Sequence, residues 1–504
     1  MLDISSVVGA LSPLNIILAV AGVAAGTVIG AIPGLTATMA VAVLVPLTFG
    51  MEPQSALILM GAIYTGAIYG GAYSAILLNT PGTPSAIATT FDGYPMAKRG
   101  DGSLAVTLSC LASVIGGLVG VFFLMTLSPP LAQIALAFGP VEYFWLAMFG
   151  LSMISALSEN SLLKGLIGAC FGLMLSFIGV AEISADVRFI FGLKTLLGGI
   201  DVVSALIGLY CVPVLIDLVA TRAHHLAITG DGGGIRLVEA LKLVWQGRFN
   251  LLRSSVIGTL VGILPGAGGS VASLVSYSEV RRSSKTPERF GQGDPQGVLA
   301  SESANNATVG GGFIPTLVLG IPGTPPDAVI LGALLVQGVK TGPGLFTSDS
   351  PIIGTFMVGL LLATILMLPI GLLIGRYAYK TIISLPKAIL APAVTVMTII
   401  GSFAIRNNTS DIVIMVVLGG IAWLLKRFGF PPSPIVLGLI LGRLAEQGFV
   451  QGWTLGTAAD SVAGAFFGRP ISLGIMALIV LTLVYPQVMA LLKRRGGRNN
   501  EFFV

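Results

Sequence analysis

Charged side chains are scarce in this sequence. Asp, Glu, Lys and Arg make up 10% of its 504 residues, whereas soluble domains carry about 25%. Hydrophobic residues supply 54% of the chain, and its mean hydropathy is +0.94. So few charges cannot keep an apolar chain in water, and the apolar content is too high for a disordered chain. The composition therefore indicates a polytopic membrane protein that lies in a lipid bilayer.

Cysteine and histidine are also rare. The three cysteines, Cys110, Cys170 and Cys211, stand singly in apolar segments, and the two histidines, His224 and His225, are adjacent in a basic loop. This spacing fits neither a transition-metal site nor a disulfide framework. The net charge of +5 comes from basic residues in loops, which is typical of cytoplasmic anchoring and not of nucleic-acid binding.

Enzyme signatures are missing as well. We find no His-Glu-x-x-His motif, no phosphate-binding loop and no Gly-x-Ser-x-Gly in a strand-turn-helix context. We therefore predict that the protein is not an enzyme and has no cofactor, unless a bound sodium ion is counted as one.

Proline and glycine interrupt the apolar sequence twice in the same way. The tetrapeptide Pro-Gly-Thr-Pro occurs at 81–84 and again at 322–325, 241 residues later. Proline cannot continue a helix, because it lacks an N–H and its ring clashes with the preceding turn. In lipid such a break is tolerated only where the backbone is buried in protein or lines a wet cavity. Matching breaks in two halves of a membrane protein point to the binding site of a transporter.

A second pair of motifs supports an internal duplication. Residues 26–34 and 258–266 are identical at five of nine positions, with an offset of 232 residues. Two motifs in the same order at nearly equal offsets indicate a repeat. We predict a first membrane repeat at 1–221, a basic cytoplasmic linker at 222–253, a second membrane repeat at 254–460, and a final transmembrane helix with a basic cytoplasmic tail at 461–504.

The fold class that follows is an all-α polytopic membrane protein with about 10–12 transmembrane helices. The apolar arm at 35–50 has 16 residues, roughly 24 Å of helix, which is short of a hydrocarbon core about 30 Å thick. We therefore expect broken helices or re-entrant hairpins with tips near Pro33 and Pro265. Only the second repeat follows a basic segment, which favours inverted repeats. The linker should carry an amphipathic helix at Ile235–Trp245.

The predicted substrate site combines the two Pro-Gly-Thr-Pro breaks, expected to face each other near the bilayer midplane, with the two hairpin tips that frame them. Unwound backbone offers N–H groups to anions, and the neutral hydroxyl and amide groups nearby add hydrogen bonds. Neither tip contains Lys or Arg, so an anion would be held without an arginine clamp. The candidate residues are Pro33, Gly34, Thr38, Asn79, Thr80, Pro81, Gly82, Thr83, Ser85, Pro265, Gly266, Gly268, Ser270, Pro322, Gly323, Thr324 and Pro325.

Polar residues around the second break suggest a site for a coupling ion. The candidates are Asp327, Ser303, Asn305, Asn306 and Thr308, which are oxygen donors suited to sodium. Each of these residues also has a purely structural explanation. Asp327 can cap the helix that follows it, and the other four can belong to a loop. Glycines in membrane helices are often packing contacts, and Thr or Ser hydroxyls often bond back to their own helix.

At these residues the chain resembles the large membrane subunit of the tripartite tricarboxylate transporters (TctA-like). The resemblance rests on residues 26–34 and 258–270, on 69–85 followed by Asp92-Gly93-Tyr94-Pro95, and on 310–326. It covers essentially the whole chain.

The resemblance implies a secondary transporter of the bacterial inner membrane that imports citrate-like di- and tricarboxylates. It also implies coupling to a sodium or proton gradient, an elevator-like movement, a small membrane subunit of about four spans, a periplasmic solute-binding protein, and a dimer of heterodimers as a possible assembly. The basic residues Lys493, Arg494 and Arg495 place the C-terminus in the cytoplasm.

The alternatives to this function are a passive channel, a structural scaffold and an intramembrane enzyme. A passive carboxylate channel would need a continuous polar lining, which the sequence does not show. A structural scaffold subunit would use the breaks only for packing. An intramembrane enzyme would need a nucleophile with a base, and we find no such pair.

Overall fold

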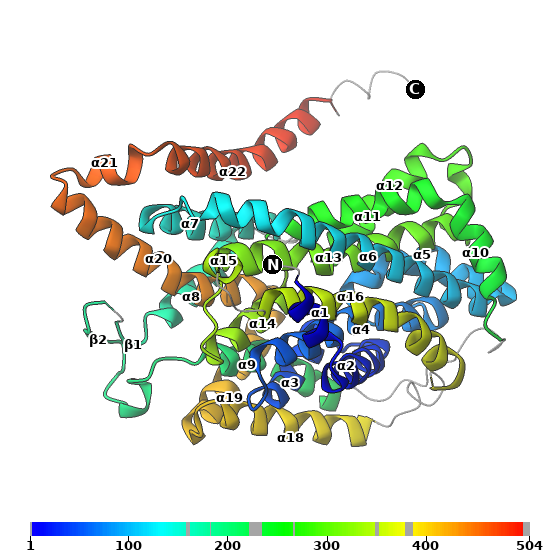
Figure 1. Cartoon of the computed structure of the whole chain (residues 1–504), viewed down its shortest axis with the longest axis horizontal. Coiled ribbons are helices and arrows are strands. Elements are labelled where there is room, and N and C mark those ends of the chain that lie inside the picture. The colour runs from blue at the N-terminus through cyan, green and yellow to red at the C-terminus, as the bar shows by residue number, and fades with distance from the viewer. Residues whose placement is uncertain are drawn as a thin grey trace. The chain divides into compact units, whose positions relative to one another are not determined.

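The computed structural model describes residues 3–157, 162–181, 183–220, 234–265, 268–347, 352–378 and 387–496. This part of the chain is almost entirely helical (Figure 1). Its strands are β1 (Gly179–Val180) and β2 (Val187–Arg188), which pair antiparallel. The predicted all-α membrane fold is confirmed.

The chain divides into two compact units. Unit 1 contains Met1–Ala135 and Val203–Trp423, and unit 2 contains Leu136–Val202 and Leu424–Val504. Each unit therefore takes segments from both halves of the sequence. The boundaries proposed above for the repeats, the linker and the final helix concern the duplication, and they stay a prediction.

Unit 1 contains both Pro-Gly-Thr-Pro breaks. Its elements are α1 (Ile4–Ala10), α2 (Pro13–Ala31), α3 (Ala37–Leu44), η1 (Val45–Thr48), α4 (Pro53–Leu78), η2 (Pro84–Ala86), α5 (Ile87–Met96), η3 (Ala97–Asp101), α6 (Gly102–Ala135), α9 (Val202–Ala220), α10 (Leu237–Gln246), α11 (Arg248–Ile263), α12 (Gly268–Ser283), η5 (Pro287–Arg289), α13 (Pro295–Leu319), α14 (Pro325–Val336), α15 (Gly344–Thr347), α16 (Ile352–Leu373), η6 (Ile374–Ala378), α18 (Lys387–Arg406) and most of α19 (Thr409–Arg427).

Unit 2 is smaller. Its elements, besides β1 and β2, are α7 (Pro140–Leu157), α8 (Leu162–Ser176), η4 (Lys194–Leu196), α20 (Pro432–Ala458), α21 (Val462–Phe467) and α22 (Pro470–Gly496).

Six described helical segments are long and apolar enough to cross a membrane, and six further apolar helices are shorter, among them Ala37–Thr48 and Pro325–Val336. The short arm expected after the first tip is confirmed, because α2 ends at Ala31 and α3 begins only at Ala37, where Thr36 caps it by accepting the Met39 N–H. Gly34 lies between them with φ +93°, a conformation that glycine adopts without strain. The amphipathic helix expected at Ile235–Trp245 is confirmed as α10, at Leu237–Gln246.

The helices α4 and α13 lead into the two breaks and lie inside the protein. The membrane-length part of α4 is completely buried, and so is nearly every residue of α13. Polar side chains on these two helices therefore face protein and not lipid. In lipid they would be costly, so a helix of this kind suits a site inside the protein.

Glycines bring the same helix pairs together in both halves. A Cβ added to Gly26 in α2 would clash with the Ile63 carbonyl of α4, and one added to Gly258 in α11 would clash with the Ala304 carbonyl of α13. The two pairs correspond at the offsets of 232 and 241 found in the sequence. A backbone contact this close is possible only with glycine.

We expect Gly26→Ala and Gly258→Ala each to destabilise the protein by about 1–3 kcal/mol, because a methyl group forced against backbone cannot be relieved by a rotamer change. The measurement is thermal unfolding of the purified protein in detergent. Gly420→Ala in α19 is the control, because nothing lies within 4 Å of a Cβ added there. Equal melting temperatures for all three variants would contradict the proposed contacts.

Candidate functional site

The two breaks have the same backbone geometry. Each helix ends on a residue in the left-handed conformation, Asn79 with φ +53° and Gly320 with φ +70°. The next N–H then turns back into the helix. Thr80 donates to the Ser74 carbonyl, and Ile321 donates to the Pro315 carbonyl, both at 3.3 Å. These bonds satisfy backbone groups that a helix end would otherwise leave unpaired.

The glycines of the breaks lie against the hairpin tips of their own halves. The Gly82 N–H donates to the Gly71 carbonyl, and the Gly323 N–H donates to the Thr316 hydroxyl, both at 3.3 Å. A Cβ added to Gly82 would clash with the Gly30 carbonyl of α2, and one added to Gly323 would meet the Gly262 carbonyl of α11 at 2.6 Å.

The chain becomes helical again at Pro84 and at Pro325. In both copies the preceding threonine is extended and its side chain makes no capping hydrogen bond to the new helix. Proline suits the first helical position, because its missing N–H is not needed there. Thr83 and Thr324 are both buried, so their hydroxyls are available to other partners inside the protein.

The first break is bonded to the second hairpin. Thr83 Oγ1 lies 3.0 Å from Ser85 Oγ, and the Ser273 hydroxyl of α12 donates to the Ser85 carbonyl at 2.9 Å. A Cβ added to Gly269, at the start of α12, would meet Ser85 Cβ at 2.9 Å and clash with Asn305 Oδ1. Thus the first break, the second tip and the middle of α13 converge on one place.

Asn305, which lies there, and the next residue of α13, Asn306, have no hydrogen-bond partners for their side chains. Asn305 and Asn306 are fully buried, and the oxygen and nitrogen of both amides are unpartnered. Such groups cost free energy unless something binds them. The other two α13 candidates bond to their own helix, because the Ser303 hydroxyl donates to the Ala300 carbonyl and the Thr308 hydroxyl donates to the Asn305 carbonyl.

At the second break, a tyrosine that the sequence analysis did not select joins the site. Tyr64 Oη of α4 lies 2.9 Å from Thr324 Oγ1, which donates to Asp327 Oδ2 at 2.5 Å. Asp327 is fully buried, and its Oδ1 has no partner. Asp327 thus hydrogen-bonds to Thr324, the N-cap residue of α14, as the acidic residue of a capping box does. The second oxygen of its carboxylate has no partner.

The contacts between the halves are reciprocal. Tyr64 of α4 touches the second break, and Asn305 of α13, 241 residues later, lies beside the first. Likewise α14 packs against α3, and α12 packs against η2 and α5. Each break is therefore held by elements of the opposite half, and the described hydrogen bonds include none directly from one break to the other.

The remaining predicted residues lie around this centre. Thr38, Ser85, Pro265 and Pro322 are buried, and Pro33, Pro81, Pro325 and Ser270 are half-buried. The exposed candidates are Asn79 and Gly34, and the Thr80 hydroxyl bonds back to the Leu78 carbonyl. Gly268 begins α12 with φ +60°. Gly266 lies outside the described residues.

Glu302 is a buried carboxylate that the sequence analysis also passed over. It is fully buried in α13 and accepts hydrogen bonds from the hydroxyls of Thr89 in α5 and Ser113 in α6, the latter at 2.9 Å. The sequence does contain a signal for Glu302, because a carboxylate in an apolar helix is by default a candidate functional residue. Its partners, however, lie about 200 residues away in the sequence.

Asp92, quoted above for the family resemblance, holds the first half to the loop before α13. Its Oδ1 accepts the N–H groups of Gly291, Gly293 and Asp294 at 2.7–2.9 Å, and its Oδ2 accepts the Tyr277 hydroxyl at 2.9 Å. With four donors this carboxylate is satisfied, which indicates a structural role.

The chemistry of the site is neutral apart from Asp327. Among the described residues, no hydrogen bond or ion pair connects a Lys or Arg to either break. The site offers hydroxyls, amides and a carboxylate oxygen, a donor set suited to a hard monovalent cation. An anionic group could bind there together with such a cation, and nothing in the arrangement resembles a nucleophile beside a base.

Comparison with known proteins identifies the family of the chain. The sequence pattern of the "Tripartite tricarboxylate transporter TctA family" matches residues 16–437. Two similar proteins come from Agrobacterium vitis. One, named "Uncharacterized 52.8 kDa protein in TAR-I ttuC' 3'region", is 35% identical over 98% of this chain and 97% of its own length. The other, "Uncharacterized protein in TAR-II ttuC' 3'region", is 36% identical over 49% of this chain and 99% of its own length.

The family match covers both Pro-Gly-Thr-Pro breaks and both hairpins, and the first relative is similar along the whole chain. The chain therefore belongs to the tripartite tricarboxylate transporter TctA family and is a multi-pass membrane component of such a transporter.

Proposed function

We propose that this protein is the large membrane subunit of a secondary transporter that imports citrate-like di- or tricarboxylates with a sodium or proton gradient. The observation that carries the proposal is the pair of matching helix breaks beside buried, unpartnered polar atoms. Packing alone does not require matching breaks, and buried amides without partners are the groups that a bound ion or substrate would satisfy.

We assign the coupling cation to Asn305, Asn306 and Asp327. Their free oxygens are hard donors, which suits sodium, and Asp327 supplies the negative charge. The carboxylate substrate would bind next to this cation and to the Thr83 and Thr324 hydroxyls. A cation held in this way replaces the arginine that the site lacks.

An elevator-like movement is consistent with the contacts of unit 1. Because each break is bonded to elements of the opposite half, both breaks and both hairpins would move as one body. We further propose inverted repeats, a location in the bacterial inner membrane and a cytoplasmic C-terminus, from the distribution of basic residues. The partners would be a small membrane subunit and a periplasmic solute-binding protein, in a dimer of heterodimers.

A passive channel is the second candidate, and a scaffold subunit is the third. A channel would need a continuous polar lining, which the sequence does not show. A scaffold does not need unpartnered amides in its interior. Transport measurements separate these functions, because only a secondary transporter requires an ion gradient.

We expect radiolabelled citrate to accumulate in proteoliposomes that contain this chain and its small partner, when a binding protein and an inward sodium or proton gradient are supplied. A protein-free liposome is the control. Uptake of another carboxylate instead of citrate would change only the substrate. Uptake that does not depend on any gradient would favour the channel and contradict coupling.

We expect Thr83→Val and Asp327→Asn each to lower uptake by about tenfold or more, because each removes a bond to a charged ligand worth about 1.5–3 kcal/mol. The assay is initial uptake per amount of folded protein in the membrane. Thr126→Val and Asp186→Asn are the matched controls, because both side chains are exposed. Unchanged uptake by both site variants would remove these residues from the site.

We expect Asn305→Ala to raise the sodium concentration needed for half-maximal uptake by about tenfold, because a cation ligand is lost. Ser303→Ala is the comparison on the same helix, and its hydroxyl already bonds to its own backbone. If a proton gradient drives uptake, sodium will not change uptake by the wild-type protein. The assignment of these residues to sodium will then be wrong.

A further inference from the structure

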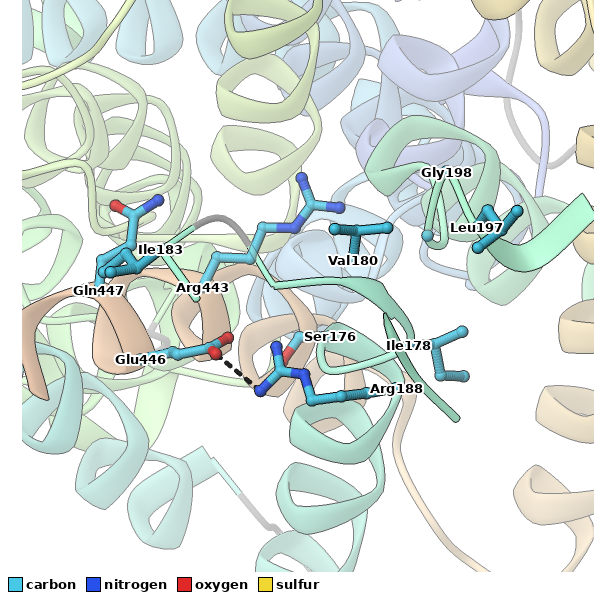
Figure 2. Close-up of a pocket in the computed structure, with 11 residues that line it drawn as sticks. Ser176, Ile178, Val180, Ile183, Arg188, Leu197, Gly198, Arg443, Glu446 and Gln447 are labelled. Carbon is cyan, nitrogen blue, oxygen red and sulfur yellow. Dashed lines mark ion pairs between the residues drawn. The ribbon is translucent and has the colours of Figure 1, made fainter. Parts of the chain in front are cut away.

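Unit 2 contains a cavity that the transport site does not use. Its volume is about 280 Å³, and it lies between the β1–β2 hairpin, the turn at Leu197–Gly199 and helix α20 (Figure 2). Small-molecule sites begin at about 300 Å³, so a cavity slightly below that size suits only a small ligand or the head group of a larger one.

The charges that line the cavity favour an anion. Arg188 forms an ion pair with Glu446 at 2.7 Å, and among the described lining residues no other carboxylate is present to pair with Arg443. Figure 2 shows the Arg443 guanidinium apart from that pair. It donates to the Ile200 carbonyl at 3.3 Å, a long bond that uses one of its five N–H groups. Arg188 Nε is buried and also has no partner.

The lining also has apolar side chains. They include Ile178, Val180 and Leu197, so the ligand should have an apolar part next to its anionic group. The backbone nearby is held in uncommon conformations, since the non-glycine residues Ala185, Phe189 and Phe191 have positive φ of 58°, 53° and 49°. Strained backbone is concentrated at ligand sites and switch regions.

We propose that this cavity is a second, separate anion site, in which Arg443 binds the carboxylate or phosphate group of a small organic anion. The same chemistry would also recognise the phosphate of an anionic lipid headgroup. The Arg188–Glu446 pair keeps Glu446 from competing for Arg443. The site does not depend on the proposed transport function, because none of its residues belongs to the helix breaks.

The test is a local labelling experiment on the full-length protein. Ile183 lines the cavity and is 45% exposed, so Ile183→Cys places a thiol at the entrance. Cys170→Ser removes the exposed native cysteine, while Cys110 and Cys211 are buried. The rate of maleimide labelling is measured in nanodiscs of neutral lipid with citrate or inorganic phosphate, and separately in nanodiscs that contain phosphatidylglycerol without added anion.

We expect an anion to slow the labelling, and Arg443→Gln to raise the concentration needed for this by about tenfold or more. Arg443→Lys should keep part of the protection by anions, because lysine preserves the positive charge but not the planar guanidinium group that can form two hydrogen bonds to one anion. Lys194→Gln is the control, since Lys194 is exposed in the same segment and does not line the cavity.

Protection by soluble anions would identify a small-molecule site, and protection by phosphatidylglycerol alone would identify a lipid headgroup site. Either result supports the proposal if it is lost in Arg443→Gln. The proposal is overturned if no anion slows labelling of the wild-type background, or if protection persists unchanged in Arg443→Gln. Failure of citrate uptake in proteoliposomes would not affect this result, because the labelling reports only on the cavity.

Discussion

Backbone hydrogen bonding inside lipid is the constraint on which this structure depends. A helix can stop within the membrane only if neighbouring groups accept its free N–H groups and donate to its carbonyls. At both breaks the left-handed residue turns the next N–H back to a carbonyl of its own helix, Ser74 or Pro315. The following glycine then lies against the partner helix, where no other residue fits. The close α2–α4 and α11–α13 contacts are therefore a condition for the breaks.

The backbone of the candidate site is satisfied, but some of its side chains are not, and the proposed ligand site rests on this contrast. Asn305 and Asn306 have four polar atoms without partners in α13, a helix that is buried along nearly its whole length. If the breaks served only for packing, apolar residues could stand in place of Asn305 and Asn306. Replacing a hydrogen-bonded pair by apolar groups is nearly neutral for stability, so stability alone does not require polar residues there. Two buried amides without partners cost free energy, unless an ion or a substrate binds them in another state of the protein.

Local signals in the sequence predicted much of this fold. Proline and glycine mark the breaks and the hairpin tips, and an amphipathic pattern marks α10, because each depends on neighbouring residues in the chain. The repeat offsets predicted the duplication, but they did not predict which helices glycine brings together. Tyr64, Glu302 and the anchoring role of Asp92 could not be predicted in this way, because their partners lie about 185–260 residues away. Composition also could not show that Ser303 and Thr80 bond to their own helices.

Three fully buried carboxylates illustrate how partners decide function. Asp92 receives four hydrogen bonds, three from backbone N–H groups, so its charge is stabilised without a ligand. Glu302 receives two bonds from hydroxyls of other helices, which fixes the positions of α5 and α6 against α13. Asp327 has one hydroxyl partner and an unpaired oxygen. Burial is equal in all three, so the number of donors distinguishes them. Asp327, the carboxylate of these three that keeps an unpaired oxygen, lies at a helix break, and this is why the proposed cation is assigned to it.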